Sequence, residues 1–392
     1  MKVRLGSLVA SLVGGIMLAS AWLPSADAQD VLKIGVVGPL TGPGAQWGLA
    51  QAGGVQIAAK EVNDKGGLKV GNKTYRIEVI AYDEQYKATI AVSAMQRLIS
   101  QDGVRFIFGP LSSAGTLAVM DIVQESKVIA ISGAYSRKAL DKTKPYMFRV
   151  YSTPAEYAQP IIDWLKKNLR TDVRRVAIIN PNDETGWDSD NLLSGTYSKN
   201  GYTVVAKELY ERSVRDYQPL LTKILAEKPD IVELGTTPPA SAGLVVRQAR
   251  ELGYKGHFVK IGGPGPRQII EGAGKEAAEG VINYMMADEQ NAGYGRLATE
   301  YKKMTGNDMN SIFVPWYDGA YILMASLQSA GTVTDTDKVR QSFAKVLPFK
   351  SVLGGNVRLG GNESYGIDNQ FFTPSYIGII KNGDVFSAGH AD

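Results

Sequence analysis

Two short loops that carry hydroxyl groups are the part of this sequence best suited to binding chemistry. Residues 109–116 (GPLSSAGT) follow an apolar run at 104–108, and residues 133–136 (GAYS) follow a second apolar run at 128–132. Each run has the composition of a buried parallel strand. Because neighbouring parallel strands end at the same edge of a sheet, we expect the two loops to face one crevice.

A helix that begins after the first loop would aim positive charge into this crevice. Ser112 or Ser113 can cap a helix over about 114–125, whose first N–H groups are unpaired and lie at the positive end of the helix dipole. This combination favours an anionic oxygen, such as that of a carboxylate or phosphate. A plain helix cap is the alternative, but two hydroxyl loops at one crevice favour a clamp for a small anion.

The elements that position these loops alternate between strand and helix, which predicts parallel, doubly wound sheets. The pattern indicates strands at 32–37 and 76–82 and helices at 46–63 and 89–100. A new unit begins at residues 153–156 (TPAE), a capping box with proline at the first helical position. The alternation then repeats, so the sequence predicts two α/β lobes in tandem.

Length, charge and cysteine content narrow the class of protein. The chain has 392 residues, enough for two domains, and a net charge of +4 with no basic block. This weak excess argues against a nucleic-acid partner. The chain has no cysteine and therefore no disulfide, so the fold depends on its apolar cores.

The first 28 residues have the features of a removable export signal. Lys2 and Arg4 precede an apolar run at 5–23, and residues 26–28 (ADA) give a small-x-small cleavage pattern. A membrane anchor is the competing interpretation, which the cleavage pattern disfavours. Without a cysteine for lipid attachment, the signal predicts release into the periplasm.

The sequence contains no residue set typical of an enzyme. It has two histidines, His257 and His390, and no His-Glu-x-x-His, G-x-S-x-G or P-loop motif. Residues 272–277 (GAGKEA) fit a dinucleotide pattern only superficially, since they follow a helical run rather than a strand. We therefore expect a binding protein without cofactor or metal. A ligand-sensing receptor domain is a second class, and a secreted hydrolase is the least favoured.

These loops and further segments resemble the leucine/isoleucine/valine-binding family of periplasmic solute-binding proteins, which serve ABC importers. The resemblance extends over nearly the whole mature chain and rests on the order and spacing of these segments: 34–43 (IGVVGPLTGP), 46–48 (QWG), 61–67 (EVNDKGG), 109–116, 131–136 (ISGAYS) and 247–250 (RQAR).

The resemblance implies a type I periplasmic binding protein, with two doubly wound parallel-sheet lobes joined by a three-segment hinge. It implies that residues 29–150 and about 285–355 form the first lobe, and that 151–284 and about 356–392 form the second. It also implies a small carboxylate ligand of the hydrophobic amino-acid type and an inner-membrane ABC permease as partner. We expect a monomer.

Roles for individual residues also follow from the resemblance. Ser113 and Ser136 fall where the family hydrogen-bonds the ligand carboxylate, beside the backbone of Leu111 and Ala134. Trp47 falls where the family places an aromatic wall.

Three further residues depart from the family's pattern. Thr185 and Thr237 occupy the positions of two cleft tyrosines, which leaves more room opposite the aromatic wall. Tyr135 stands where the family has a small residue, and we expect it to fill part of that space.

The expected counter-charge for a ligand ammonium group is missing. Where the family places an acidic residue, residues 261–266 read IGGPGP. Closing an ammonium into a cleft without a counter-charge costs several kcal/mol. Either Asp183 or Glu184 supplies the charge from a neighbouring loop, or the ligand is an aromatic or aliphatic acid without an amine.

Overall fold

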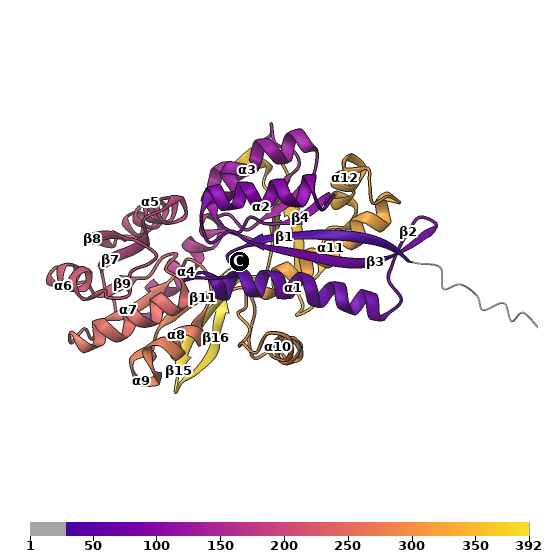
Figure 1. Cartoon of the computed structure of the whole chain (residues 1–392). Coiled ribbons are helices and arrows are strands. Elements are labelled where there is room, and N and C mark those ends of the chain that lie inside the picture. The colour runs from indigo at the N-terminus through magenta and orange to yellow at the C-terminus, as the bar shows by residue number, and fades with distance from the viewer. Residues whose placement is uncertain (1–28, 392) are drawn as a thin grey trace, which may run out of the picture.

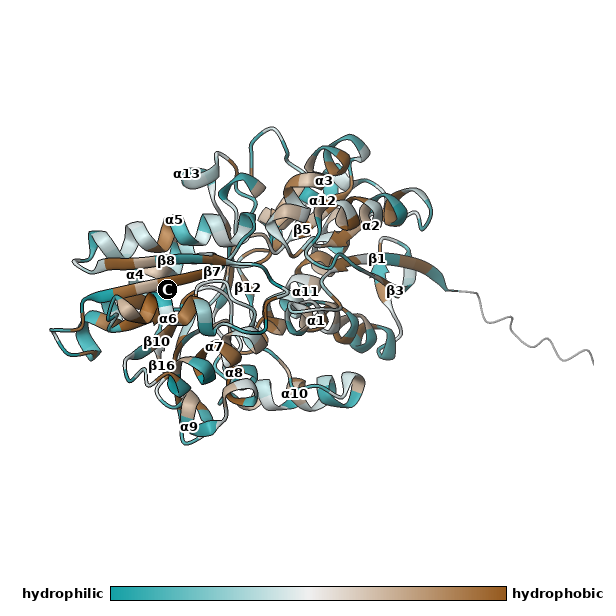
Figure 2. Cartoon of the chain, turned by 60° about the vertical axis from the view of Figure 1, so that its left-hand side comes forward, coloured by the Kyte–Doolittle hydropathy of each residue, from teal (hydrophilic) through white to brown (hydrophobic). Residues whose placement is uncertain are grey.

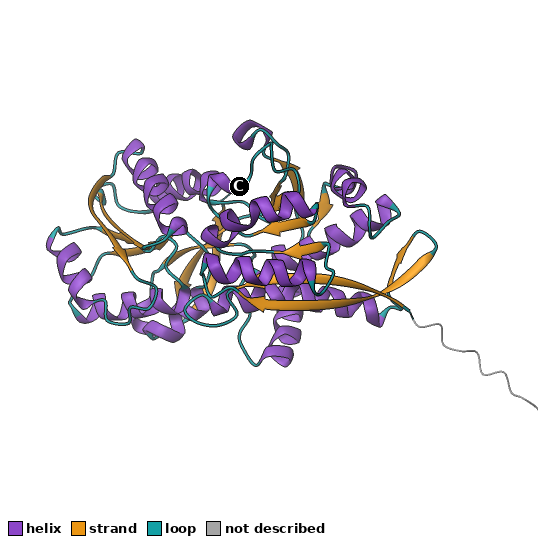
Figure 3. Cartoon of the chain, turned by 45° about the horizontal axis from the view of Figure 1, so that its top comes forward, coloured by secondary structure: helices purple, strands orange, loops and turns teal. Residues whose placement is uncertain are grey.

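The computed structural model describes residues 29–391 as two α/β lobes that lie side by side (Figure 1). Each lobe contains one sheet with helices packed around it, which Figure 3 shows by secondary structure. The predicted export signal, residues 1–28, lies outside the described residues. In the described part of the chain, no helix combines the length and apolar character needed to cross a membrane.

The first lobe is built on a nine-stranded sheet with the order β12-β13-β14-β6-β5-β4-β1-β3-β2. The six strands from β14 to β3 run parallel, and antiparallel pairs lie at the two edges. The strands are β1 (Asp30–Gly38), β2 (Leu68–Val70), β3 (Lys73–Asp83), β4 (Phe106–Phe108), β5 (Ile129–Ser132), β6 (Met147–Arg149), β12 (Phe349–Lys350), β13 (Asn356–Gly360) and β14 (Gln370–Phe372).

The second lobe is built on a seven-stranded sheet with the order β16-β15-β11-β10-β9-β7-β8. The strands from β11 to β8 run parallel, and the C-terminal hairpin β15–β16 adds two antiparallel strands. The strands are β7 (Arg175–Pro181), β8 (Thr203–Tyr210), β9 (Ile231–Glu233), β10 (His257–Lys260), β11 (Ile282–Met285), β15 (Tyr376–Lys381) and β16 (Asp384–His390).

Helices cover both sheets, as the alternating pattern predicts. Figure 1 shows α1 on one side of the nine-stranded sheet and α2 and α3 on the other. The first lobe contains α1 (Ala45–Asp64), α2 (Ala88–Ser100), α3 (Ser113–Ser126), the 3₁₀ turn η1 (Arg137–Ala139), α10 (Ala292–Thr305), α11 (Phe313–Ala330), α12 (Thr336–Val346) and α13 (Asn362–Tyr365). The second contains α4 (Pro154–Asn168), α5 (Glu184–Lys199), α6 (Gln218–Ala226), α7 (Pro239–Glu251), α8 (Pro266–Ala273) and α9 (Lys275–Ala278).

Apolar side chains of the strands are buried in both lobes, and Figure 2 shows the hydrophobic colour along strands such as β7. Strands β4 and β5 are buried along their whole length, as expected for central parallel strands. Helix α1 packs closely on α11, where a Cβ on Gly54 would lie 2.8 Å from the carbonyl oxygen of Phe313. The predicted capping box starts α4: the Thr153 N–H donates to Glu156 Oε2 (2.5 Å), and the Ala155 N–H donates to Thr153 Oγ1 (3.3 Å).

The chain passes between the lobes three times: after β6, after β11 and after β14. The assignment of residues 356–372 to the second lobe is wrong, because β13 and β14 extend the sheet of the first lobe next to β6. The third crossing therefore lies between Phe372 and Tyr376. Short strands in a glycine-rich segment show no preference for either sheet in their sequence, so this boundary could not be read from their pattern.

Candidate functional site

A narrow cavity lies between the two lobes, with a free volume of about 20 Å³, which is the room of about one water molecule. The first lobe contributes the start of α1, the turn after β3 and the loops after β4 and β5, and the second contributes the start of α5 and the loops after β9 and β10. The lining residues are uncharged: Trp47, Tyr86, Leu111, Gly133, Tyr135, Tyr151, Thr185, Thr236, Gly263 and Ile312. Such walls suit a small, mostly apolar ligand with few polar groups.

A larger groove, of about 550 Å³, belongs to the second lobe alone. Its lining includes charged residues such as Lys228, Asp230 and Lys255, and it runs past the amino ends of β9 and β10. Ligands of doubly wound sheets bind at the carboxyl ends of the strands. The smaller cavity between the lobes has that position and is therefore the candidate site.

The predicted anion-binding helix start holds a carboxylate of the protein itself. Ser112 caps α3 by accepting a hydrogen bond from the Gly115 N–H (3.0 Å). The buried Glu84 accepts from the Ser112 N–H (2.8 Å) and from the Ser112 hydroxyl (2.9 Å). Burial raises the pKa of Glu84 to about 7, against the opposing effect of the bonds from Ser112.

Replacing Glu84 by glutamine is expected to change how stability depends on pH. The folded pKa of about 7 lies above the ordinary value of 4.5, so the stability contributed by Glu84 is present below pH 4.5 and is lost as the pH rises through 7. Glutamine does not titrate. From pH 5 to 8, the free energy of unfolding of the wild type should fall by about 2–3 kcal/mol relative to Glu84→Gln.

Urea unfolding of both proteins at pH 5 and pH 8 measures this difference. Other buried acids titrate in both proteins, so the comparison isolates Glu84. Equal changes in the free energy of unfolding would contradict the assignment.

The two serines predicted to hold the ligand carboxylate are bonded to each other. The Ser136 N–H donates to Ser113 Oγ (3.1 Å), which joins the two loops, and both residues are buried. The Ser113 N–H donates to Thr185 Oγ1 of the other lobe (3.3 Å), and the Ala134 N–H donates to Ser132 Oγ (2.9 Å). The structure brings the two loops together, but neither serine nor Ala134 lines the cavity.

Leu111 and Tyr135 are the members of these loops that reach the cavity. The Tyr157 hydroxyl donates to the Tyr135 hydroxyl (3.2 Å), and the Tyr135 ring meets Tyr151 edge to face at 6.0 Å between ring centres. Burial raises the pKa of Tyr135, so its hydroxyl stays protonated. Tyr135 thus occupies cavity space, as its size predicts.

Trp47 forms one wall and also joins the lobes. It lies on the first turn of α1 and is 4% exposed, and its Nε1–H donates to the carbonyl oxygen of Pro264 in the second lobe (2.8 Å). A Cβ on Gly263 would come within 2.8 Å of the indole. The segment predicted to lack an acid therefore packs directly against Trp47.

Of the threonines predicted in the second lobe, Thr185 lines the cavity and Thr237 does not. Thr236 takes that place in the wall, whereas Thr237 is buried and its N–H donates back to the Leu234 carbonyl (3.0 Å). Gly235 turns the chain there with φ of +44°, a turn that sets which of the two threonines faces the cavity.

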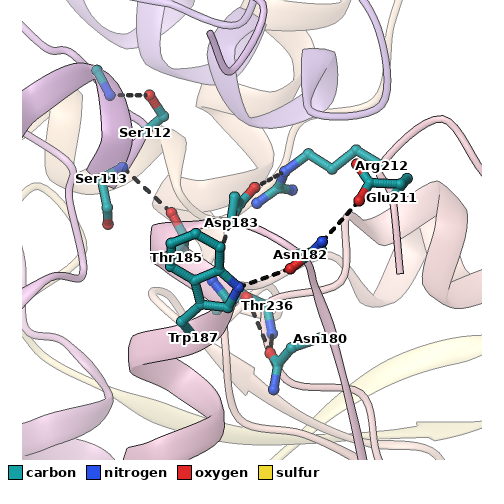
Figure 4. A network of polar contacts seen from close by, with 12 residues as sticks. Ser112, Ser113, Asn180, Asn182, Asp183, Thr185, Trp187, Glu211, Arg212 and Thr236 are labelled. Atoms are coloured by element: carbon teal, nitrogen blue, oxygen red, sulfur yellow. Dashed lines mark hydrogen bonds and ion pairs between the residues drawn. The ribbon is translucent and has the colours of Figure 1, made fainter. Parts of the chain in front are cut away.

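Neither predicted acid reaches the cavity. Asp183 caps α5, with one oxygen accepting from the Gly186 N–H (3.0 Å) and the other from Arg212 Nε (2.5 Å), as Figure 4 shows. Glu184 lies in the first turn of α5, is partly exposed and does not line the cavity. In this closed arrangement the cavity has no carboxylate in its walls.

Two cavity-wall tyrosines and a nearby cation were not predicted. Tyr86 lies in the turn after β3, and Tyr151 lies just after β6. Arg212, from the loop after β8, places its guanidinium carbon 3.9 Å from the centre of the Tyr86 ring. These residues follow strands that end at the same two sheet edges, which is the signal that could have identified them.

A second buried cation lies behind the Trp47 wall. Lys260 Nζ lies 5.5 Å from the centre of the Trp47 ring and donates to the carbonyl oxygens of Gly235 (3.0 Å) and Gly262 (2.5 Å). Burial lowers the pKa of Lys260 to about 7 and raises the pKa of the neighbouring Glu233 to about 7. Both side chains hydrogen-bond to the backbone of the loops after β9 and β10, which form part of the second-lobe wall.

The walls are suited to contact with a ligand, which would need the lobes further apart than here because the free space between them is about 20 Å³. The walls offer aromatic faces for an apolar body and the side chains of Thr185, Thr236 and three tyrosines for polar groups. Because both lobes contribute walls and contacts cross between them, the complete cavity exists only when the lobes are together.

Comparison with known proteins identifies relatives of this chain. The chain is 28% identical to the Leu/Ile/Val-binding protein BraC3 of Rhizobium johnstonii, over 86% of this chain and 88% of that protein. It is 26% identical to the leucine-specific-binding protein of Salmonella typhimurium, over 82% and 83% of the two chains.

Solved structures share the fold. A branched-chain amino-acid transporter substrate-binding protein from Streptococcus pneumoniae, in complex with isoleucine, has a TM-score of 0.78, 21% identity and coverage of 92% and 99%. A solute-binding protein of an ABC transporter from R. palustris, in complex with benzoate, has a TM-score of 0.78, 18% identity and coverage of 92% and 96%.

The sequence model of the family described as periplasmic binding protein matches residues 31–384. This match includes the strands of both sheets up to β15 and every segment that lines the cavity between them. The chain therefore belongs to the periplasmic binding protein family.

Proposed function

We propose that this protein is the periplasmic substrate-binding component of an ABC importer and that it encloses one small carboxylate between its lobes. The observation that supports this most is the cavity itself, which is walled by both lobes and lined with aromatic and hydroxyl groups. Its walls contain no nucleophile paired with a base, so we propose binding and not catalysis.

The ligand we favour is an aromatic or aliphatic acid without an amine. No cavity-wall residue carries a carboxylate, and Asp183 is committed to Arg212 and to the start of α5. An enclosed ammonium would lose its hydration without gaining a counter-charge, at a cost of several kcal/mol. The apolar part of an amine-free acid instead gains contact with Trp47 and the tyrosine rings.

A hydrophobic amino acid is the second candidate, because the named relatives bind leucine, isoleucine or valine. The aromatic faces of the cavity are the groups that could meet its ammonium, by cation–π contact. Such contacts are worth about 0.5–2 kcal/mol. This is less than the several kcal/mol that an ammonium group loses when it is removed from water.

The partner that this function requires is an inner-membrane permease, which would receive the ligand from the closed protein. The export signal predicted at residues 1–28 is consistent with a periplasmic location. We expect the binding protein to act as a monomer, since its cavity is completed by the two lobes of one chain.

A thermal-shift screen of matched pairs tests the proposal. The pairs are leucine with 4-methylpentanoate and phenylalanine with 3-phenylpropanoate, with benzoate added as a rigid acid. At a hundredfold excess over Kd, a true ligand should stabilise the protein by about 2.7 kcal/mol. We expect this from at least one amine-free acid. No response to any of the five compounds would contradict the proposed function.

A further inference from the structure

One buried cation beside the cavity has hydrogen-bond donors without a partner. Arg212 Nε donates to Asp183, whereas Nη1 and Nη2 have no acceptor among the described residues and no contact with solvent. The side chain is 12% exposed. Burial is the largest effect and lowers the pKa of Arg212, but Asp183, Tyr86 and Tyr210 together outweigh it and the pKa is raised, so the guanidinium stays charged. Buried donors of a charged group normally have acceptors.

Arg212 lies directly behind the cavity wall. The centre of the Tyr86 ring, which belongs to the first lobe and lines the cavity, lies 3.9 Å from the guanidinium carbon of Arg212. Asp183, toward which Figure 4 shows Arg212 extending, precedes the cavity-wall residue Thr185 by two positions. Gln85 and Tyr86 both have positive φ, at 50° and 57°, which is a strained conformation for non-glycine residues.

Several other donors near the cavity already have acceptors within the protein, and the hydroxyl groups of Ser113, Ser136 and Tyr135 carry no charge. The Ser112 N–H and hydroxyl are bonded to Glu84, and the Ser113 N–H is bonded to Thr185. Lys260 has two carbonyl partners. Among the described groups beside the cavity, Arg212 therefore combines a full positive charge with unused donors.

We propose that Arg212 is an anion-binding residue of this site, with Nη1 and Nη2 donating to the acidic oxygens of the bound ligand in place of the contact with the Tyr86 ring. A guanidinium fork fits a carboxylate with two parallel hydrogen bonds. Asp183 fixes the fork through Nε and neutralises part of its charge. The inference rests on the proposed function and adds a charged contact from the second lobe to the anion subsite.

Three variants test this subsite by calorimetry with benzoate, 3-phenylpropanoate and 4-methylpentanoate, each beside its neutral amide. Arg212→Gln should weaken binding of the acids by about 10- to 100-fold and leave binding of the amides within about threefold. Arg215→Gln is the matched control, because Arg215 is an exposed arginine in the same loop that does not line the cavity. Its affinities should equal those of the wild type.

Asp183→Asn gives a test of opposite sign. Asparagine caps helices as well as aspartate does, so α5 should keep its start while Arg212 loses its internal counter-charge. We expect the acids to bind about three- to tenfold more tightly, a gain that misfolding cannot produce. If Arg212→Gln does not fold, this variant decides alone.

The outcomes separate the subsite from the function. Acid binding by the wild type that is unchanged in Arg212→Gln, or weakened in Asp183→Asn, would overturn the role of Arg212 and leave the proposed function intact. A wild type that binds none of the three acids would overturn both.

Discussion

Trp47→Ala should weaken ligand binding by about 100-fold or more. The indole is buried between the lobes, lines the cavity and donates across the cleft to Pro264, so its removal leaves a large void in the closed protein. Truncating a buried tryptophan to alanine typically costs about 3–5 kcal/mol, and each 1.4 kcal/mol corresponds to a factor of ten in affinity. Isothermal titration of the strongest ligand from the matched pairs measures the loss.

Trp47→Phe is the matched control for this variant. Phenylalanine keeps most of the aromatic wall and removes the hydrogen bond to Pro264, so we expect a loss of only about three- to tenfold. Near-normal affinity in Trp47→Ala would mean that the ligand does not rest against this wall.

Gly263→Ala should lower affinity by about 100-fold without unfolding either lobe. The added Cβ would lie 2.8 Å from the Trp47 indole, which belongs to the other lobe, so it obstructs closure. Overpacking against Trp47 costs about 1–3 kcal/mol and acts on closure, whereas the positive φ of 81° costs roughly 1 kcal/mol of stability with or without ligand. Titration calorimetry measures the affinity, and small-angle scattering should show a larger radius of gyration than the liganded wild type.

Gly280→Ala separates closure from backbone strain. Gly280 also has a positive φ, 75°, but an added Cβ would meet nothing within 4 Å. It should lose some stability and keep its affinity. Equal affinities of Gly263→Ala and Gly280→Ala would mean that the closed contact between Gly263 and Trp47 plays no part in binding.

The lobes and the outer frame of the site could be predicted because strand and helix periodicity is strong along most of this chain. The runs at 104–108 and 128–132 proved to contain adjacent parallel strands, which is why the loops after them meet. Trp47, Leu111, Tyr135 and Thr185 line the cavity for the same reason. Each of these residues lies in the segment that follows a strand, and therefore near the carboxyl edge of its sheet.

The polar connections within the site could not be predicted. The positive start of α3 suggests an anion, but only the folded structure shows that Glu84, from the turn after another strand, is that anion. Asp183 likewise suits a ligand ammonium by charge, yet it pairs with Arg212, 29 positions further on. A side chain's partner depends on which strands become neighbours, and local residue types do not contain that information.

Titration of the wild type with 3-phenylpropanoate and with phenylalanine tests the central claim most directly, because the two ligands differ by one ammonium group. The walls contain aromatic and hydroxyl groups and no carboxylate. The amine-free acid should therefore bind at least tenfold more tightly than the amino acid, as should 4-methylpentanoate relative to leucine. Tight binding of either amino acid with no measurable binding of its amine-free partner would contradict the account.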